Sequence, residues 1–200
     1  NRFTNPRYNL LVSNMFFKEK TVSSEETGHK FLARWDDVQQ FTLCDENGNL
    51  ITAYCADKNS PAIKGFNYNL YNLEDASYYS YNEARMIRAI ANHGYWGTES
   101  GIGSLESIKD ELRTLGEFTD EEIDRLTPGM ALTATQYAIW TFSNVMDEVE
   151  FFNAYEKTTY PAKEANQEDV ALIFKLYKHL INVTPSSSGS SMSPAVLSSP

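Results

Sequence analysis

The hydrophobic period of this chain changes along its length from two residues to about 3.6, and this change is the strongest constraint on its fold. Residues 41 to 55 alternate apolar and polar side chains, as half-buried strands do. Asn47-Gly48 interrupts the alternation, and this dipeptide is favoured in two-residue hairpin turns. We therefore predict a β-hairpin in which Cys44 pairs with Ile51.

The same register bears on whether the two cysteines form a disulfide. It pairs Gln40 with Cys55, so Cys44 and Cys55 would share a face about four residues apart, on the order of 13 Å at the rise of a strand. A disulfide requires a much shorter separation. We therefore expect Cys44 to be a small, buried, apolar residue.

Downstream of the hairpin, apolar side chains recur at helical spacing between capping residues. The predicted helices cover residues 82–93, 104–116, a short segment opened by a capping box at 119–122, the segment around Gln136, and 167–181. Strands in the first third followed by helices predict an α+β fold with partly segregated lobes.

Composition narrows the possible partners. The 200 residues carry a net charge of −10, which opposes binding to nucleic acid or to an anionic membrane surface. No apolar run reaches the length of a membrane-spanning helix. We expect one domain over residues 1–184 and a flexible Ser- and Pro-rich linker over 185–200, in a fragment excised from a longer chain.

The sequence predicts no metal or cofactor. The three histidines are scattered, and the cysteines form no Cys-x-x-Cys pair. The acidic run at 45–49 resembles the opening of a calcium loop, but Leu50 and Ala56 stand where such a loop needs Gly and Glu.

Gln136 supports two interpretations. Thr133 and Gln136 match a capping box, in which the glutamine side chain only accepts from the Thr133 amide near a helix start. Alternatively, the carboxamide is an acyl group in an apolar setting, because Trp140 lies one helical turn further on.

Cys55 is similarly ambiguous. A cysteine at a strand end is often inert packing. A thiol can also condense with a glutamine carboxamide, which releases ammonia and leaves a thioester. The residues alone leave both readings of Cys55 and Gln136 open.

The two segments together resemble a known family. Tyr54-Cys55-Ala56 is followed 81 positions after the cysteine by Gln136 in Thr-Gln-Tyr-Ala-Ile-Trp. This order and spacing, with the helical segment 83–95 between, are similar to the thioester domains of Gram-positive surface adhesins. The similarity spans about residues 30 to 180.

This resemblance implies a β-rich lobe that carries Cys55, a helical lobe that carries Gln136, and a thioester at their junction. It implies shielding or supporting roles for four neighbours of these residues: Tyr54, Tyr137, Ile139 and Trp140. It also implies an extracellular protein anchored to the cell wall through regions outside this fragment.

The implied activity is single-use covalent adhesion rather than turnover catalysis. A lysine of a host surface or matrix protein would attack the thioester and form an isopeptide bond, and small amines would act as surrogates. We expect a monomer. Two alternatives remain: a non-covalent binding module, and a Cys55-dependent acyl transferase that uses His93. His93 also fits the cap of its helix end.

Overall fold

The computed structural model describes residues 3–5, 10–12, 16–17, 22–23, 39–44, 50–56, 70–73, 79–143 and 167–184. Most residues whose side chains are described belong to helices, and the strands all precede them in the chain. This arrangement confirms a mixed α and β composition. The linker predicted at 185–200 lies outside the described residues.

The strands of the described residues form one antiparallel sheet in the order β3-β5-β6-β1-β2-β7, with β4 also paired to β5. Their bounds are β1 Phe3–Asn5, β2 Leu10–Val12, β3 Phe16–Phe17, β4 Val22–Ser23, β5 Gln39–Cys44, β6 Leu50–Cys55 and β7 Leu70–Asn72. The β1·β6 pair, inside the sheet, places Cys55 opposite Phe3.

The predicted β5–β6 hairpin exists, but its predicted register is wrong by one residue. Cys44 pairs with Leu50 rather than Ile51, and Gln40 pairs with Tyr54 rather than Cys55. Five residues, 45–49, therefore separate the paired strands, so the connection is longer than a two-residue turn. Because neighbouring positions of a strand belong to opposite faces, Cys44 and Cys55 occupy opposite faces of the sheet, not one face.

Four predicted helices are confirmed: α1 Tyr81–His93, α2 Leu105–Leu115, α3 Asp120–Arg125 and α6 Gln167–Ile181. Capping residues explain their bounds. Ser80 and Glu83 form a capping box at the start of α1, and Thr119 and Glu122 form another at α3. Gly116 ends α2 in the left-handed conformation that glycine adopts without strain.

The helix around Gln136 is longer than the capping-box interpretation implies. Helix α4 runs from Pro128 to Ser143, so Gln136 lies in its middle and not near its start. Thr127 begins this helix, since its hydroxyl accepts from the Met130 amide at 3.3 Å. Proline at the first helical position fits the same start. The hydroxyl of Thr133 instead donates to the Gly129 carbonyl one turn earlier.

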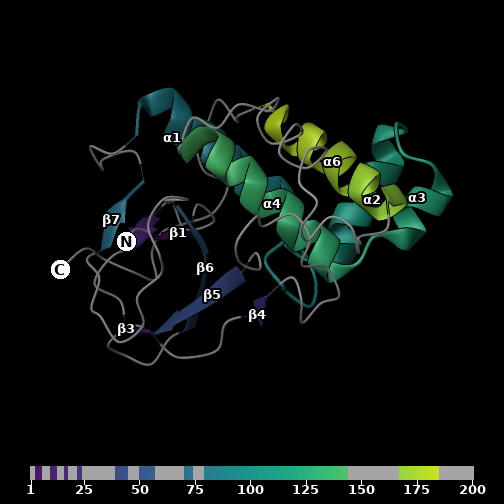
Figure 1. Cartoon of the computed structure of the whole chain (residues 1–200). Helices are drawn as coiled ribbons and strands as arrows, with labels where there is room; N and C mark the ends of the chain where they lie inside the picture. Colours follow the sequence, from purple (N-terminus) through teal and green to yellow (C-terminus); the bar gives the residue numbers. More distant parts are fainter. Residues whose placement is uncertain are drawn as a thin grey trace.

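Helix α4 is the centre of the molecule. It passes between the strands and the other helices, with α6 alongside it and α2 and α3 at the far end (Figure 1). Every residue from 129 to 139 is buried, because neighbours cover this helix on all sides. Tyr54 of β6 belongs to the same hydrophobic cluster as the helices, so the strand end that carries Cys55 packs into the helical core.

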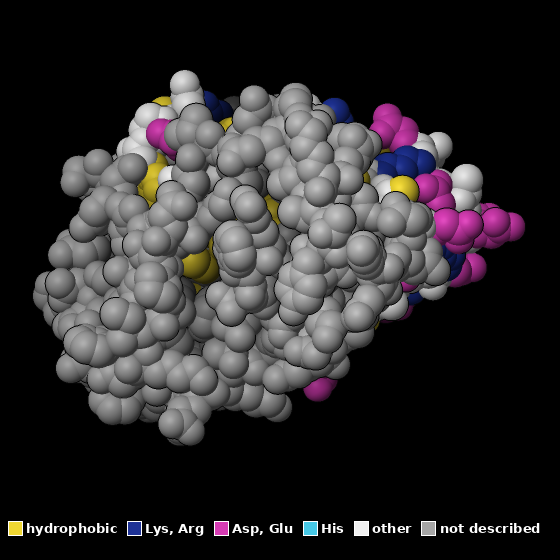
Figure 2. Space-filling view, viewed as in Figure 1, with side chains coloured by type: hydrophobic (Ala, Val, Ile, Leu, Met, Phe, Trp, Pro, Cys, Tyr) yellow, Lys and Arg dark blue, Asp and Glu magenta, His cyan; other side chains and the backbone are white. Residues whose placement is uncertain are grey.

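The surface at the α2–α3 end carries many acidic side chains (Figure 2). The first turn of α3 contributes Asp120, Glu121 and Glu122, where carboxylates are favoured by the helix dipole. Ion pairs fasten this end to α6, among them Arg125 to Asp169 at 2.6 Å and Lys175 to Glu122 at 2.9 Å.

Candidate functional site

Cys55 and Gln136 meet in the structure although 81 positions separate them. Cys55 is the last residue of β6, and Gln136 extends from the middle of α4. The Cys55 amide donates to Gln136 Oε1 at 3.0 Å, and Gln136 Nε2 donates to the Cys55 carbonyl at 2.8 Å. The capping interaction with Thr133 is therefore not the role of this glutamine side chain.

The paired hydrogen bonds fix the orientation of the carboxamide. The backbone N–H of Cys55 requires an acceptor and its carbonyl requires a donor, so the oxygen and nitrogen of the amide cannot be exchanged. The amide carbon is consequently held beside the Cys55 backbone, and the cysteine Sγ is only two bonds from the Cα of that backbone. This brings a nucleophilic atom and an acyl carbon into one small site.

Burial differs between the two partners. Gln136 is 1% exposed, and Thr135 and Ala138 near it in α4 are fully buried. Cys55 is a reduced, half-buried cysteine. The carboxamide is thus shielded from water, while the cysteine stands at the boundary between core and surface. Burial of the carboxamide limits its exposure to water, which slows hydrolysis of an acyl group.

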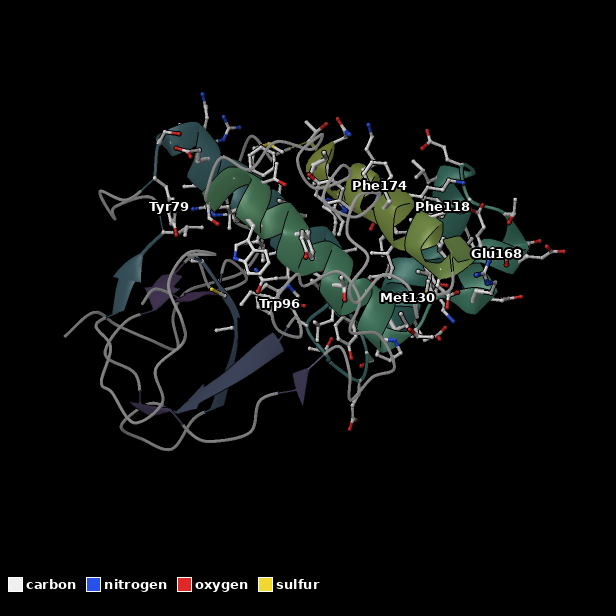
Figure 3. All side chains as sticks on the ribbon, viewed as in Figure 1. Tyr79, Trp96, Phe118, Met130, Glu168 and Phe174 are labelled. Atoms are coloured by element: carbon white, nitrogen blue, oxygen red, sulfur yellow. The ribbon has the colours of Figure 1, made fainter. Side chains whose placement is uncertain are left out.

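The residues next to the pair in the chain include two aromatic residues that pack on further rings. Tyr54 is fully buried and packs edge-to-face on Trp96 with ring centroids 5.1 Å apart. Tyr137 packs in the same manner on Trp140, at 5.3 Å. Trp96 lies on the side of α4 that faces the strands (Figure 3). Edge-to-face pairs of this kind restrict ring motion as well as burying apolar area.

Of the four residues expected to shield the site, Tyr54, Tyr137 and Ile139 are buried and Trp140 is half-buried. Burial raises the pKa of the Tyr137 phenol, and burial likewise raises the pKa of Tyr95. Neither hydroxyl is therefore a base near neutral pH.

Residues that the sequence reasoning missed connect the two halves of the site. The Tyr54 hydroxyl donates to the Tyr95 carbonyl at 2.5 Å, and the Tyr95 amide donates to Thr135 Oγ1 at 3.0 Å. Tyr54 precedes Cys55 and Thr135 precedes Gln136. The only sequence signal for this link is the position of Tyr95 directly after Gly94, the predicted helix stop.

The structure gives His93 a partner outside the site. Its imidazole contacts Glu111 of α2, and His179 Nε2 of α6 lies 3.7 Å from the same carboxylate oxygen. Partial burial raises the pKa of Glu111, but the neighbouring imidazoles of His179 and His93 outweigh it and lower this pKa to about 2. His93 thus joins helices through a side chain, rather than only capping its own helix end.

The described residues include neither a metal-binding group nor a membrane-spanning helix. Within these ranges, no group of His, Cys, Asp and Glu is arranged to hold a metal ion. No helix there is both long and apolar enough to cross a membrane.

Comparison with known proteins gave one match. The family model described as "TED: Thioester domain" matches residues 52–184, about two thirds of the chain, and this range includes both Cys55 and Gln136. Searches of curated proteins and of solved structures found no match.

Proposed function

The chain belongs to the thioester domain family, and on that premise we propose that Cys55 and Gln136 form an internal thioester that captures an amine covalently. The observation that carries this proposal is the pair of hydrogen bonds between the Gln136 carboxamide and the Cys55 backbone. The matched range contains one cysteine, Cys55, and two glutamines, Gln136 and Gln167. The contact across 81 positions supports Gln136 as the partner of Cys55.

Formation of the thioester is a substitution at the Gln136 amide carbon. The Cys55 sulfur adds to this carbon, the C–N bond breaks, and the amide nitrogen leaves as ammonia after it takes up the thiol proton. An amide is a poor electrophile, so the reaction depends on the fold holding both groups in contact at high effective concentration. Burial of Gln136 keeps water from competing.

The Cys55 amide supports the same chemistry. Its N–H donates to Gln136 Oε1, the oxygen that gains negative charge when a nucleophile adds to the carbonyl carbon. A donor already aimed at that oxygen stabilises the tetrahedral intermediate without reorganisation. This donor serves both the formation of the thioester and the later attack by an amine.

Capture of an amine is a second substitution at the same acyl carbon. A deprotonated primary amine, in our proposal a lysine of a host surface or matrix protein, attacks the acyl carbon. The C–S bond breaks, Cys55 takes up a proton, and Gln136 is left in an isopeptide bond. The chain does not return to its starting state, so each molecule acts once and is not an enzyme with turnover.

The setting implied by this activity is also a proposal. We infer that the chain is part of a Gram-positive surface adhesin, anchored to the cell wall through regions beyond residues 1–200. The net charge of −10 favours approach of a cationic, lysine-bearing target. We propose that it acts as a monomer, with α+β halves that meet at the Cys55–Gln136 contact, and as one domain over residues 1–184.

Intact mass tests the proposal directly. A chain with the thioester is lighter than its sequence by one ammonia, and methylamine adds its own mass while exposing one titratable thiol. A chain of full mass that reacts at once with iodoacetamide would contradict the proposal and support an acyl transferase. A chain of full mass that retains its ligand after Cys55→Ala would support a non-covalent binding module.

A further inference from the structure

We propose that the Tyr95 peptide is a positioning bridge that sets the contact between Cys55 and Gln136 and so controls how fast the thioester forms. This inference rests on the proposed function. The Tyr95 side chain takes no part in the chemical step. Instead, the backbone N–H and C=O of Tyr95 act through Thr135 and Tyr54, which precede the two reacting residues in the chain.

The bridge consists of two hydrogen bonds on one residue. The Tyr95 carbonyl accepts from the Tyr54 hydroxyl at 2.5 Å, and the Tyr95 amide donates to Thr135 Oγ1 at 3.0 Å. Tyr54 lies on β6 and Thr135 on α4. Both are fully buried, where hydrogen bonds are not weakened by competition with water.

The bridge can affect the site because its two partners are adjacent in the chain to the reacting residues. Tyr54 is bonded directly to Cys55, and Thr135 is bonded directly to Gln136. A link between Tyr54 and Thr135 therefore fixes how closely the strand end approaches the helix. Reactions between neighbouring groups are sensitive to displacements of about 1 Å, so such a link affects the rate of ring closure more than the stability of the fold.

The segment that carries the bridge is itself held at both ends. On one side, the Gly94 amide donates to the Ile90 carbonyl at 2.7 Å and so fastens the segment to the end of α1. On the other, the Trp96 amide donates to the Gly103 carbonyl at 2.8 Å, and the Trp96 indole donates to the Ala91 carbonyl at 2.9 Å. The Tyr95 peptide is thus a fixed reference point rather than part of a freely moving loop.

Close packing at Gly94 strengthens this interpretation. A Cβ added at Gly94 would lie 2.7 Å from Thr135 Cγ2, well inside van der Waals contact. The backbone before Tyr95 therefore rests directly on the Thr135 side chain. Glycine is required at position 94 because Thr135 lies so close, and not because of the backbone conformation, since the φ of Gly94 is −94°.

Thr133 offers a matched control for Thr135. Each threonine is buried in α4 and donates to the carbonyl four residues earlier at 2.7 Å: Thr133 to Gly129, and Thr135 to Ala131. Only Thr135 also accepts from Tyr95. Replacement by valine keeps the size and branching of either side chain, so the difference between the two variants isolates the bridge.

The experiment follows ammonia loss by intact mass while the full chain folds for the first time, starting from material recovered in denaturant from inclusion bodies with the Gln136 carboxamide still present. We expect Thr135→Val to form the thioester about tenfold more slowly than Thr133→Val, the effect of about one lost hydrogen bond on a barrier. Thr135→Ser should restore the rate. Tyr54→Phe, which removes one hydroxyl and keeps the ring on Trp96, should be slow in the same way.

Equal rates for Thr135→Val and Thr133→Val, or a normal rate for Tyr54→Phe, would overturn the bridge. Because Tyr54→Phe removes only a hydroxyl, it provides a test even if Thr135→Val does not fold. Because Thr135→Val leaves the Tyr95 amide without its Thr135 acceptor, it should melt below Thr133→Val. Rates compared at a temperature at which both variants are fully folded separate positioning from general loss of stability. Absence of ammonia loss in the unaltered chain would instead refute the thioester proposal itself.

Discussion

At the scale of single residues, the main feature is that one carboxamide satisfies both backbone groups of Cys55. The oxygen and nitrogen of Gln136 each make one hydrogen bond to this residue, at 3.0 and 2.8 Å. The glutamine therefore contributes to stability as well as to the proposed chemistry. Variants at Cys55 and at Gln136 should share a loss of capture and differ in stability.

We predict that Cys55→Ala and Gln136→Ala each abolish formation of complexes that resist denaturant on gels. Relative to the chain before the thioester forms, Cys55→Ala should change the free energy of unfolding little, because its backbone bonds to Gln136 remain. On the same reference, Gln136→Ala should cost about 1–3 kcal/mol, since it removes two hydrogen bonds to the Cys55 backbone. Cys44→Ala is the control and should capture normally; loss of capture in that variant would contradict the assignment of Cys55.

At the scale of elements, the decisive contact is between the end of β6 and the middle of α4. Helix α4 is buried on all sides, so it cannot shift without disturbing its neighbours. The segment after α1 packs on this helix at Gly94 and Thr135. A change where Gly94 packs on Thr135 should therefore also affect the contact between Cys55 and Gln136.

We expect Gly94→Ala to reduce the free energy of unfolding by about 1–3 kcal/mol, since its Cβ would meet Thr135 Cγ2 at 2.7 Å and the Ile90 carbonyl oxygen at 2.9 Å. It should also slow thioester formation, as followed by mass. Gly116→Ala is the control: its φ of 76° makes alanine unfavourable, but no atom lies within 4 Å of the added Cβ. That variant should lose stability alone; slowed thioester formation there would argue against a specific effect at Gly94.

Local signals predicted the helices well because caps and apolar spacing act over a few residues. Ser104 and Thr119 each begin a helix at the expected place, and α1 begins within one residue of its predicted start. The start of α4 was predicted wrongly because Thr133 resembles a cap, while the actual cap is Thr127 before Pro128. A threonine inside a helix can bond back to the preceding turn, and only the fold distinguishes the two cases.

Contacts between distant segments could not be derived from spacing. The hairpin register depends on the five residues 45–49, whose composition fits more than one turn. The link from Tyr54 through Tyr95 to Thr135 joins three segments, and none of these residues has a distinctive motif. The resemblance to a family supplied the Cys55–Gln136 pair, and the structure brings these two residues into contact.

At the scale of the whole molecule, one carboxylate ties three helices together. Glu111 of α2 contacts His93 at the end of α1 and lies near His179 in the last turn of α6. Since α1 leads directly to Tyr95, this cluster supports the helical core behind the site. The stabilisation that this cluster gives to the fold should depend on pH.

We predict that Glu111 stabilises the fold above about pH 4.5 and that this contribution is lost as pH falls toward 2. The sign follows from a folded-state pKa lowered from 4.5 to about 2, which means that the native state favours the carboxylate. Partial exposure reduces the effect to about 1–2 kcal/mol. Urea unfolding of the unaltered chain and of Glu111→Gln should differ at pH 6 by about this amount and converge in acid; a constant difference would contradict the prediction.

The hydrogen bond from Gln136 Nε2 to the Cys55 carbonyl has a consequence for the end state. In the proposed thioester form, departure of ammonia removes that donor, so the Cys55 carbonyl would lose this hydrogen bond. An isopeptide nitrogen carries one hydrogen and can take the vacated place, whereas hydrolysis would leave a carboxylate oxygen facing a carbonyl oxygen. Amine capture would thus return a hydrogen-bond donor to the Cys55 carbonyl, whereas hydrolysis would not. This difference favours the captured form over the hydrolysed one.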